Sequence, residues 1–268
     1  HIEQTAFERM VEEARSLIRQ GDMFQCVLSQ RFSAEYSGRP LDYYRNLRVT
    51  NPSNYLYFYD FGDYQIIGAS PESLVSVKQG QVTTNPIAGT RPRGKDERED
   101  KALAKELLAD EKEVAEHRML VDLGRNDIGK IAQNNSVEVT KYMEVEYFRY
   151  VMHLTSVVRG QLLPQLTAMD ALKSTLPAGT VSGAPKIRAM KRIYELEQEK
   201  RGVYAGAIGY LSATGDMDVA IAIRTMILKN GRAYVQAGAG IVYDSIPTNE
   251  YQETINKAKS MTKIGEMQ

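Results

Sequence analysis

The chain has 268 residues, enough for one large domain or two small ones with a sizeable core. Its 34 basic and 34 acidic residues balance, which removes any electrostatic argument for binding nucleic acid or a membrane surface. No run approaches the roughly 18 apolar residues that a membrane span needs, and the amphipathic N-terminus lacks a signal-peptide core. The single cysteine, Cys26, excludes an internal disulfide and lies in an apolar run, so we expect a core residue in a reducing compartment. These features predict a cytoplasmic protein without nucleic-acid or membrane partners.

Helical and strand-like patterns alternate along the chain. Helical spacing or helix-favouring composition predicts helices over Phe7–Arg19, Lys95–Ala115, Ile187–Glu199 and Asn249–Met261. The strand-like runs are Phe24–Phe32, Tyr55–Phe61, Gln65–Ala69, Leu74–Lys78, Val137–Tyr150, Val151–Val158, Ala205–Ser212, Val219–Leu228 and Ala233–Gln236. Between the last two runs, Asn230-Gly231 is a strong signal for a two-residue hairpin. Runs of strands with helices between them predict an α+β fold with large antiparallel sheets sandwiched by helices.

The segment LPAGTVSGAPK, residues 176–186, precedes a predicted helix and has the composition of an anion-binding loop. Gly179 and Gly183 would let the backbone approach a ligand, and Pro185 suits the first turn of a helix. Lys186 adds a positive charge in that turn, where the helix dipole disfavours a cation unless an anion lies nearby. A loop and helix cap without a ligand is the alternative interpretation.

Two pairs of glutamates are spaced for a common helix face. Glu113 and Glu116 are three residues apart, and Glu250 and Glu253 repeat the spacing, with Lys257 extending the second face. Carboxylate oxygens are the ligands that Mg²⁺ prefers, so the four glutamates predict a magnesium site. Solvated helix surfaces are the alternative, and they are the more common explanation of such pairs.

The segment QAGAGIV, residues 236–242, alternates glycine and alanine, which would leave backbone N–H groups accessible to a carboxylate. A tightly packed buried strand explains the same pattern. Arg224 lies in the run VAIAIRTMIL, where an unpaired charge is costly, so it is expected to grip a carboxylate or to form a structural salt bridge.

Three further titratable residues stand out. His153 lies among apolar residues, where a hydrogen-bonded core histidine is the usual explanation, and His117 is a candidate structural partner. Glu72 follows Ala-Ser-Pro at a strand end and could serve as a general acid if burial raised its pKa, or as a helix cap.

Taken together, the motifs resemble those of the chorismate-utilising enzymes, in the family's order. They are PIAGTRPRG (86–94), AEHRMLVDLGRNDIGK (115–130), HLTSVVRG (153–160), LPAGTVSGAPK (176–186), YAGAIGY (204–210), AIRT (222–225), QAGAGIVYDS (236–245) and EYQETINKA (250–258). Within the family, the chain resembles the catalytic domain of anthranilate synthase component I. The resemblance covers essentially all of residues 1–268 and implies one chorismate-binding α/β sandwich domain, without the longer N-terminal regulatory region of most members.

The resemblance implies a role for each matching residue. Glu116 and Glu253 would be the principal Mg²⁺ ligands, supported by Glu113 and Glu250. The chorismate-binding residues would be Gly89, Thr90, Tyr204, Arg224, Gly238, Ala239, Gly240 and Lys257. Glu72 would protonate the departing 4-hydroxyl, while His153 and Thr180 would assist the later proton transfer.

The implied reaction adds ammonia at C2 of chorismate, removes the hydroxyl as water and eliminates pyruvate to give anthranilate, a step of tryptophan biosynthesis. Ala88 supplies no amine where relatives that make aminodeoxychorismate carry a lysine, which favours ammonia as the nucleophile. The sister reaction and a catalytically weak chorismate-binding domain remain the alternatives.

Two departures from the family pattern concern regulation and partners. NPSNYLY, residues 51–57, differs from the family's NPSPYMF inhibitor segment, so we expect weak or absent inhibition by tryptophan. The sequence has no glutaminase signature, so glutamine-dependent activity would need a separate amidotransferase subunit.

Overall fold

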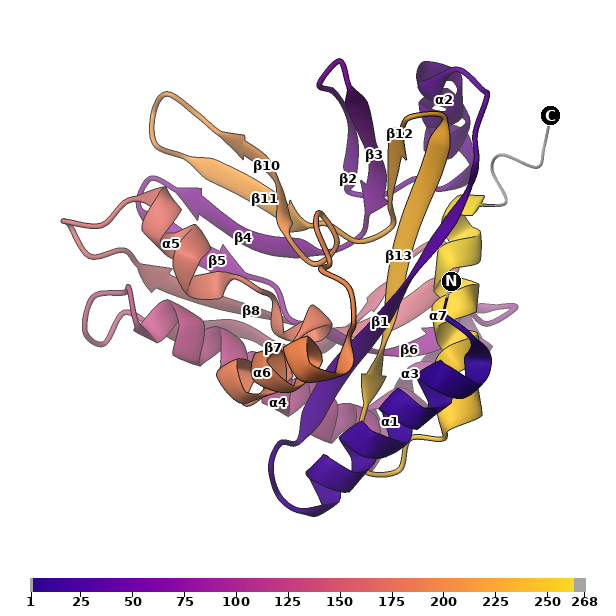
Figure 1. Cartoon of the computed structure of the whole chain (residues 1–268). Coiled ribbons are helices and arrows are strands. Elements are labelled where there is room, and N and C mark those ends of the chain that lie inside the picture. Colours follow the sequence, from indigo (N-terminus) through magenta and orange to yellow (C-terminus); the bar gives the residue numbers. More distant parts are fainter. Residues whose placement is uncertain (1, 263–268) are drawn as a thin grey trace. The chain divides into compact units, whose positions relative to one another are not determined.

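The computed structural model describes residues 2–262 and divides into two compact units (Figure 1). Unit 1 consists of the described residues up to Pro71, Pro177–Ile208 and the described residues from Ala220 onwards. Unit 2 consists of Glu72–Leu176 and Gly209–Val219.

Unit 1 is built on a six-stranded antiparallel sheet. Its strands, in spatial order, are β2 (Tyr55–Asp60), β3 (Tyr64–Ser70), β12 (Thr225–Lys229), β13 (Arg232–Ile241), β1 (Gln25–Glu35) and β9 (Gly183–Ala184). Its helices are α1 (Gln4–Arg19), α2 (Pro40–Thr50), α6 (Lys186–Leu196) and α7 (Pro247–Thr262), with a 3₁₀ turn, η1, at Gly179–Val181.

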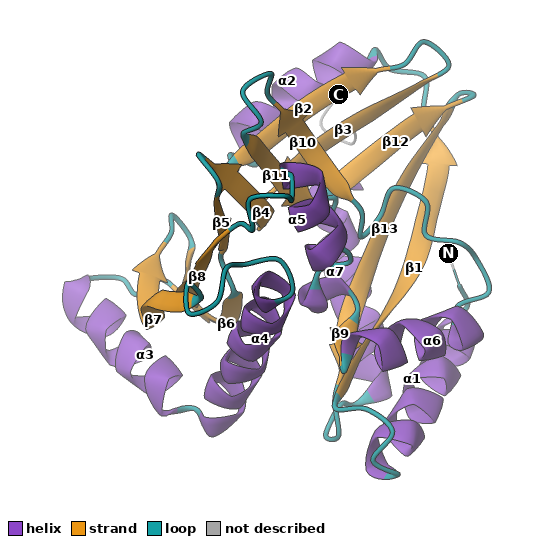
Figure 2. Cartoon of the chain, turned by 90° about the vertical axis from the view of Figure 1, so that its left-hand side faces the viewer, coloured by secondary structure: helices purple, strands orange, loops and turns teal. Residues whose placement is uncertain are grey.

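Helices cover the sheet of unit 1 because alternate strand residues are apolar. α1 and α6 pack on β1, and α7 packs along β13 (Figure 2). In β13, Val235, Ala237 and Ala239 are buried, at the two-residue spacing of one strand face. Cys26 lies in this core, and burial raises the pKa of its thiol to about 12, so the predicted core role is confirmed.

Unit 2 is built on a seven-stranded sheet. The path runs β10 (Ala207–Leu211), β11 (Met217–Ile221), β4 (Ser73–Lys78), β5 (Gln81–Thr84), β8 (Val151–Gln161) and β6 (Ile87–Pro92), and β7 (Glu138–Tyr147) also pairs with β8. Its helices are α3 (Glu97–Ala109), α4 (Glu111–Gly129) and α5 (Ala168–Thr175). α4 packs along β6 and β8.

The predicted α+β fold with large antiparallel sheets is confirmed, and two predicted elements are wrong as single elements. The helix predicted over Lys95–Ala115 ends at Ala109 and a second begins at Glu111, because the side chain of Asp110 accepts the N–H groups of Lys112 and Glu113 as an N-cap. The strand predicted over Val219–Leu228 is divided between β11 and β12, which belong to different sheets.

Other expectations hold within a few residues. Asn230 and Gly231 form the predicted hairpin turn with φ values of 52° and 70°, the left-handed conformations that a two-residue loop requires. The strand predicted to end at Gln236 continues to Ile241, and the helix predicted to reach Glu199 ends at Leu196. Among residues 2–262, no helix combines the length and apolar composition needed to cross a bilayer.

Candidate functional site

At the glycine-rich end of β13, backbone N–H and C=O groups on the side of β12 lie beyond the end of that strand. β13 pairs with β1 along its whole length, but its ladder with β12 ends at Val235. The two-residue hairpin makes Lys229 and Arg232 a hydrogen-bonded pair, and the direction of backbone groups alternates along a strand. The N–H and C=O groups of Gly238 and Gly240 therefore point toward the side of β12, beyond its end.

Ala239 differs from its two neighbours. Its backbone points toward its register partner Leu28 in β1, and its side chain is fully buried in the apolar core. Of the three residues predicted to bind substrate through this segment, only the two glycines direct backbone groups to the open side. The interpretation as a tightly packed strand is confirmed, because Ala237, Gly238 and Ala239 are buried, whereas carboxylate binding by the glycine N–H groups stays a prediction.

Gly238 lies directly beneath Tyr204. A Cβ atom on Gly238 would lie 2.6 Å from the Tyr204 hydroxyl oxygen and 2.9 Å from the Leu28 carbonyl oxygen. Lys257 Nζ, on α7, donates to the Gly238 carbonyl oxygen at 2.9 Å. The structure therefore brings together three predicted substrate-binding residues that lie far apart in the sequence.

A cavity of about 560 Å³ opens beside this group in unit 1. Its lining residues are Arg224, Asn249, Gln252, Glu253, Asn256, Lys257 and Ser260. Lys257 Nζ pairs with Glu253 Oε1 at 2.5 Å, as expected for residues four apart on one helix face. The cavity thus combines two cations, one carboxylate and several neutral polar groups.

Arg224 does not lie in a strand as predicted. It occupies the break between β11 and β12 with a φ of 48°, and its carbonyl oxygen accepts from the Ala69 N–H at 3.1 Å. The left-handed conformation interrupts the extended backbone at Arg224, and β12 begins at the next residue. The structure places Arg224 at the wall of the cavity.

The Thr180 loop is a compact 3₁₀ turn followed by the short strand β9. Ser182 Oγ donates to the Ala178 carbonyl oxygen at 2.7 Å, which closes the turn. A Cβ on Gly183 would lie 2.2 Å from the Gln25 carbonyl oxygen, so this glycine is required for contact with β1 and not for approach to a ligand. Pro185 is the N-cap of α6, one position before the predicted first turn.

In unit 2, β6 and β8 bring together Gly89, Thr90 and His153. Gly89 has a φ of 68° at a register shift in the ladder, a conformation that favours glycine. His153 Nδ1 lies 2.8 Å from the Gly89 carbonyl oxygen and 3.1 Å from Thr90 Oγ1. Donation from Nδ1 to the carbonyl leaves Nε2 of a neutral imidazole as the acceptor, which is the atom that can take a proton.

The other histidine of unit 2 is structural. His117 is fully buried on α4, and its Nε2 lies 2.6 Å from Ser156 Oγ. Burial lowers the pKa of His117 to about 4, so it stays neutral near neutral pH.

The four predicted metal ligands form one pair in each unit. Glu113 and Glu116 lie on α4 in unit 2, and Glu250 and Glu253 lie on α7 in unit 1. Within the described residues of either unit, no group of three or more His, Cys, Asp or Glu could hold a metal ion. The donor chemistry nevertheless suits Mg²⁺, because each pair supplies carboxylate oxygens on one helix face.

Two carboxylates of unit 2 have defined surroundings. Glu113 Oε1 lies 3.5 Å from Arg91 Nη1, and its other oxygen would lie 3.3 Å from a Cβ on Gly89. Arg91 also binds Glu106 and Asp110, whose hydrogen bonds raise the pKa of its guanidinium. Glu72 is half-buried immediately before β4.

Sequence reasoning missed Arg201 and Glu197, which form a buried ion pair beneath Tyr204. The two residues are four apart, a common surface spacing at the end of a charged helix. Arg201 precedes the motif YAGAIGY by three residues, and that adjacency was the one signal available.

Known proteins with similar sequences share one description. A profile of the family described as chorismate binding enzyme matches residues 1–263. Anthranilate synthase component 1 of Lactococcus lactis is 62% identical over 266 residues, covering 99% of this chain and 58% of that protein. The corresponding protein of Aquifex aeolicus is 54% identical, over 97% of this chain and 53% of that protein.

Solved structures agree with the sequence comparison. The crystal structure of anthranilate synthase component I from Streptococcus pneumoniae matches with a TM-score of 0.92 and 82% identity, covering 98% of this chain and 58% of that one. MenF, the menaquinone-specific isochorismate synthase from Escherichia coli, matches with a TM-score of 0.89 and 26% identity, over 98% of this chain and 61% of that one. The chain spans little more than half the length of these relatives.

Proposed function

The chain belongs to the chorismate binding enzyme family, and we propose that it carries the active site of an anthranilate synthase component 1. The proposed reaction is chorismate plus ammonia to anthranilate, pyruvate and water. One structural observation carries the proposal: unit 1 places Arg224 and Lys257 at one cavity, and Lys257 also binds the backbone of Gly238.

Chorismate is a dianion, and the residues of unit 1 supply complementary groups. Arg224 can grip a carboxylate with two parallel hydrogen bonds, and we assign it to the enolpyruvyl side. Lys257 contributes a point charge, while Tyr204 and the N–H groups of the two glycines contribute neutral donors. Orientation of the substrate by several convergent groups lowers the entropic part of the barrier.

The proposal assigns the proton transfers to three residues. Glu72 donates a proton to the 4-hydroxyl, which then leaves as water and not as hydroxide. After ammonia has added at C2, His153 takes part in the proton transfer that accompanies pyruvate loss, since its Nε2 can accept a proton. Thr180, in η1, assists that later step.

Mg²⁺ is the proposed cofactor, with Glu116 and Glu253 as principal ligands and Glu113 and Glu250 supporting them. When bound, the ion would neutralise substrate charge and polarise the ring system as a Lewis acid. The hydrogen bond and ion pair that Lys257 makes hold Glu253 in a defined orientation.

Ammonia is the proposed nucleophile. Ala88, in β6 opposite Leu154, offers no amine that could attack the ring in its place. Glutamine-dependent activity would require a separate amidotransferase subunit as the ammonia source. We further propose that residues 1–268 act as one catalytic domain.

The deciding experiment mixes the purified chain with chorismate, Mg²⁺ and ammonium at mildly alkaline pH, following anthranilate fluorescence and pyruvate release. We expect both products in equal amounts, and loss of both when EDTA is added. An aminated product that keeps its enolpyruvyl group would instead identify the aminodeoxychorismate reaction. Chorismate binding without any product would identify a binding domain without turnover.

Substitution of the principal carboxylates tests the metal assignment. We expect Glu116→Gln or Glu253→Gln to raise the Mg²⁺ concentration needed for half-maximal turnover by more than about 100-fold. Loss of an outer-shell partner alone lowers metal affinity or activity about 10- to 100-fold. Glu111→Gln, an exposed residue of the same helix α4, is the matched control and should keep normal activity. Full activity in either principal variant would remove that residue from the metal site.

A further inference from the structure

Arg201 uses its guanidinium to join three separate segments of unit 1. Its Nε and Nη2 bind the two carboxylate oxygens of Glu197 at 2.8 and 2.6 Å, a bidentate pair. Its Nη1 donates to the Val181 carbonyl oxygen at 2.6 Å, and Nη2 donates to the Val27 carbonyl oxygen at 2.7 Å. The side chains of Arg201 and Glu197 are only 16% and 7% exposed.

The carboxylate of Glu197 extends these contacts to the sheet. Its Oε1 accepts from the Ser29 N–H at 2.8 Å and from Ser29 Oγ at 2.9 Å. Gln236 Nε2 in turn donates to Ser29 Oγ at 2.9 Å. The contacts therefore run from the end of α6, through β1, to a residue of β13 that precedes Gly238 by two.

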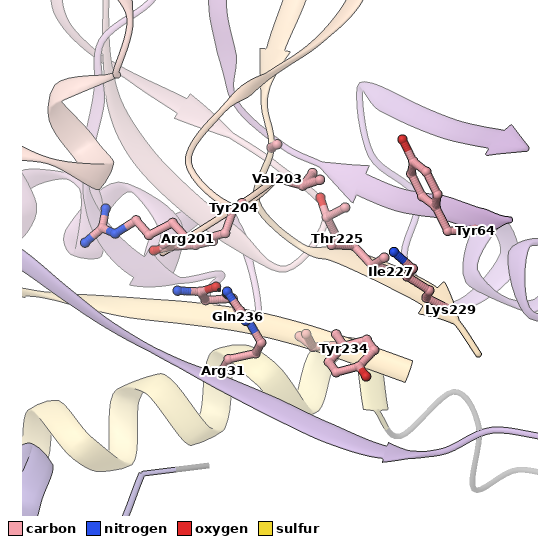
Figure 3. Close-up of a pocket in the computed structure, with 13 residues that line it drawn as sticks. Arg31, Tyr64, Arg201, Val203, Tyr204, Thr225, Ile227, Lys229, Tyr234 and Gln236 are labelled. Atoms are coloured by element: carbon pink, nitrogen blue, oxygen red, sulfur yellow. Dashed lines mark hydrogen bonds between the residues drawn. The ribbon is translucent and has the colours of Figure 1, made fainter. Parts of the chain in front are cut away.

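Tyr204 rests on the same guanidinium. The Arg201 Cζ lies 5.4 Å from the centre of the Tyr204 ring, a distance typical of a cation–π contact (Figure 3). Tyr204 is 8% exposed and its hydroxyl lies over Gly238. Val181 is the last residue of η1, the turn that contains Thr180. Arg201 thus contacts Tyr204 and the turn that contains Thr180. Glu197 contacts the strand of Gly238 only through Ser29, which accepts from Gln236.

A buried ion pair of this kind has little value as a source of stability. Burial lowers the pKa of Arg201, but the hydrogen bonds and charge of Glu197 outweigh that effect and leave the pKa raised. The cost of taking both charges out of water largely offsets their attraction, and an apolar pair of similar size is often as stable. What apolar side chains cannot provide is a set of directed hydrogen bonds that fixes three backbone segments at once.

We propose that Arg201 and Glu197 are positioning residues of the active site, which hold the Thr180 turn, the Tyr204 ring and the Gly238 strand in the arrangement that binds chorismate. This inference rests on the proposed function. Neither residue touches the substrate in this role, and both act through the three elements they join.

Arg201→Lys tests the proposal, because lysine keeps the charge but cannot donate to Glu197, Val181 and Val27 together. We expect kcat/KM for chorismate to fall by about 10- to 100-fold, as for small displacements of binding groups. Glu197→Gln keeps the side-chain volume and should give a loss of the same kind. Arg192→Lys is the matched control, since Arg192 on α6 binds Asp22 and Glu195 and contacts none of the three elements. Its kcat/KM should stay within about twofold of wild type.

A double-mutant cycle with Tyr204→Phe separates positioning from a general loss of structure. If Arg201 acts by aiming the Tyr204 hydroxyl, Arg201→Lys should have a smaller effect once that hydroxyl is gone. Additive effects, or equal losses in Arg201→Lys and Arg192→Lys at matched thermal stability, would overturn the proposal. Chorismate binding, followed by calorimetry in all variants, provides a readout independent of turnover.

Assays of the wild-type chain distinguish failure of the positioning role from failure of the proposed function. If it makes anthranilate and Arg201→Lys behaves like the control, the positioning role fails while the proposed function stands. If the wild type neither binds nor converts chorismate, the proposed function fails and the positioning role fails with it.

Discussion

At the scale of single residues, Gly238 shows the close packing that its motif predicted, while substrate binding by its backbone stays a prediction. Its missing side chain leaves room for the Tyr204 hydroxyl on one face, and its backbone faces the edge beyond the end of β12. Lys257 Nζ donates to its carbonyl oxygen. The same glycine thus packs closely beneath Tyr204 and accepts a hydrogen bond from Lys257.

Gly238→Ala should destabilise the fold and impair substrate binding together. The new methyl group would meet the Tyr204 hydroxyl and the Leu28 carbonyl at less than 3.0 Å, and overpacking of this kind costs about 1–3 kcal/mol. Denaturant unfolding and chorismate calorimetry measure the two effects. Gly129→Ala, at a helical position with nothing within 4 Å of the added atom, is the control and should keep chorismate binding and not lower the free energy of unfolding. Equal behaviour of the two variants would contradict the packing argument.

Arg224 illustrates a residue whose predicted strand conformation is wrong, while its predicted role in binding a carboxylate stays a prediction. An arginine in an apolar run was expected to meet a carboxylate or a structural partner, and the structure places it at a polar cavity. Its left-handed backbone was invisible in the sequence, because β-branched and apolar neighbours favour a continuous strand.

At the scale of elements, the sequence analysis missed a chain break and also whole helices, since α2, α5 and α4 beyond Ala115 had no predicted counterpart. α3 and the first residues of α4 were taken as one helix, Lys95–Ala115, because its charged composition favours helix. Asp110 ends the first helix by capping the second and by binding Arg91 through its other oxygen at 2.8 Å. The tertiary partner on β6 thus favours the cap over continuation.

The Asn230-Gly231 turn permits an element-scale prediction. A Cβ at Gly231 would have open space within 4 Å, so the only cost of Gly231→Ala is its φ of 70°. We expect a loss of about 1 kcal/mol in the free energy of unfolding, measured by urea denaturation. Asn230→Gly, in the same turn, should change the free energy by only a few tenths of a kcal/mol. A neutral Gly231→Ala variant would show that the hairpin can adopt another turn type.

At the scale of the whole molecule, the charges balance, but several carboxylates form hydrogen-bonded ion pairs with arginines. Hydrogen bonds from Arg192 and Arg188 hold the pKa of Asp22 well below its ordinary value of 3.8. Arg93 lowers the pKa of Asp100 in the same way, through its side-chain hydrogen bonds. Each carboxylate binds a proton more readily in the unfolded chain than in the folded one.

This difference fixes the sign of the acid response. The stability these groups provide is fully present above the ordinary carboxyl pKa and is lost as the pH falls through their lower folded values. We expect the free energy of unfolding to be level from neutral pH to about pH 5 and to fall below pH 4. Urea titrations across this range measure it, and Asp22→Asn should flatten the fall. A curve for Asp22→Asn that follows wild type would exclude Asp22 as a contributor.

The sequence by itself determined the fold class and the family, while the chemistry of each motif stays a prediction. Strand alternation, the hairpin signal and the ordered motifs are local patterns, so they can be recognised in the sequence without the tertiary structure. The candidate site residues within each unit were therefore identified correctly as neighbours where one motif or one helix face contained them, as with Glu253 and Lys257.

Only the tertiary structure decided which backbone groups of β13 are open, why Gly183 must be glycine and what lies beneath Tyr204. The contacts of Arg201 with Val27 and of Glu197 with Ser29 join residues 174 and 168 positions apart, where no periodic signal reaches. Directed hydrogen bonds between distant segments depend on how the sheet is assembled. Their positions follow from strand register and helix packing and are not encoded in any short stretch of the chain.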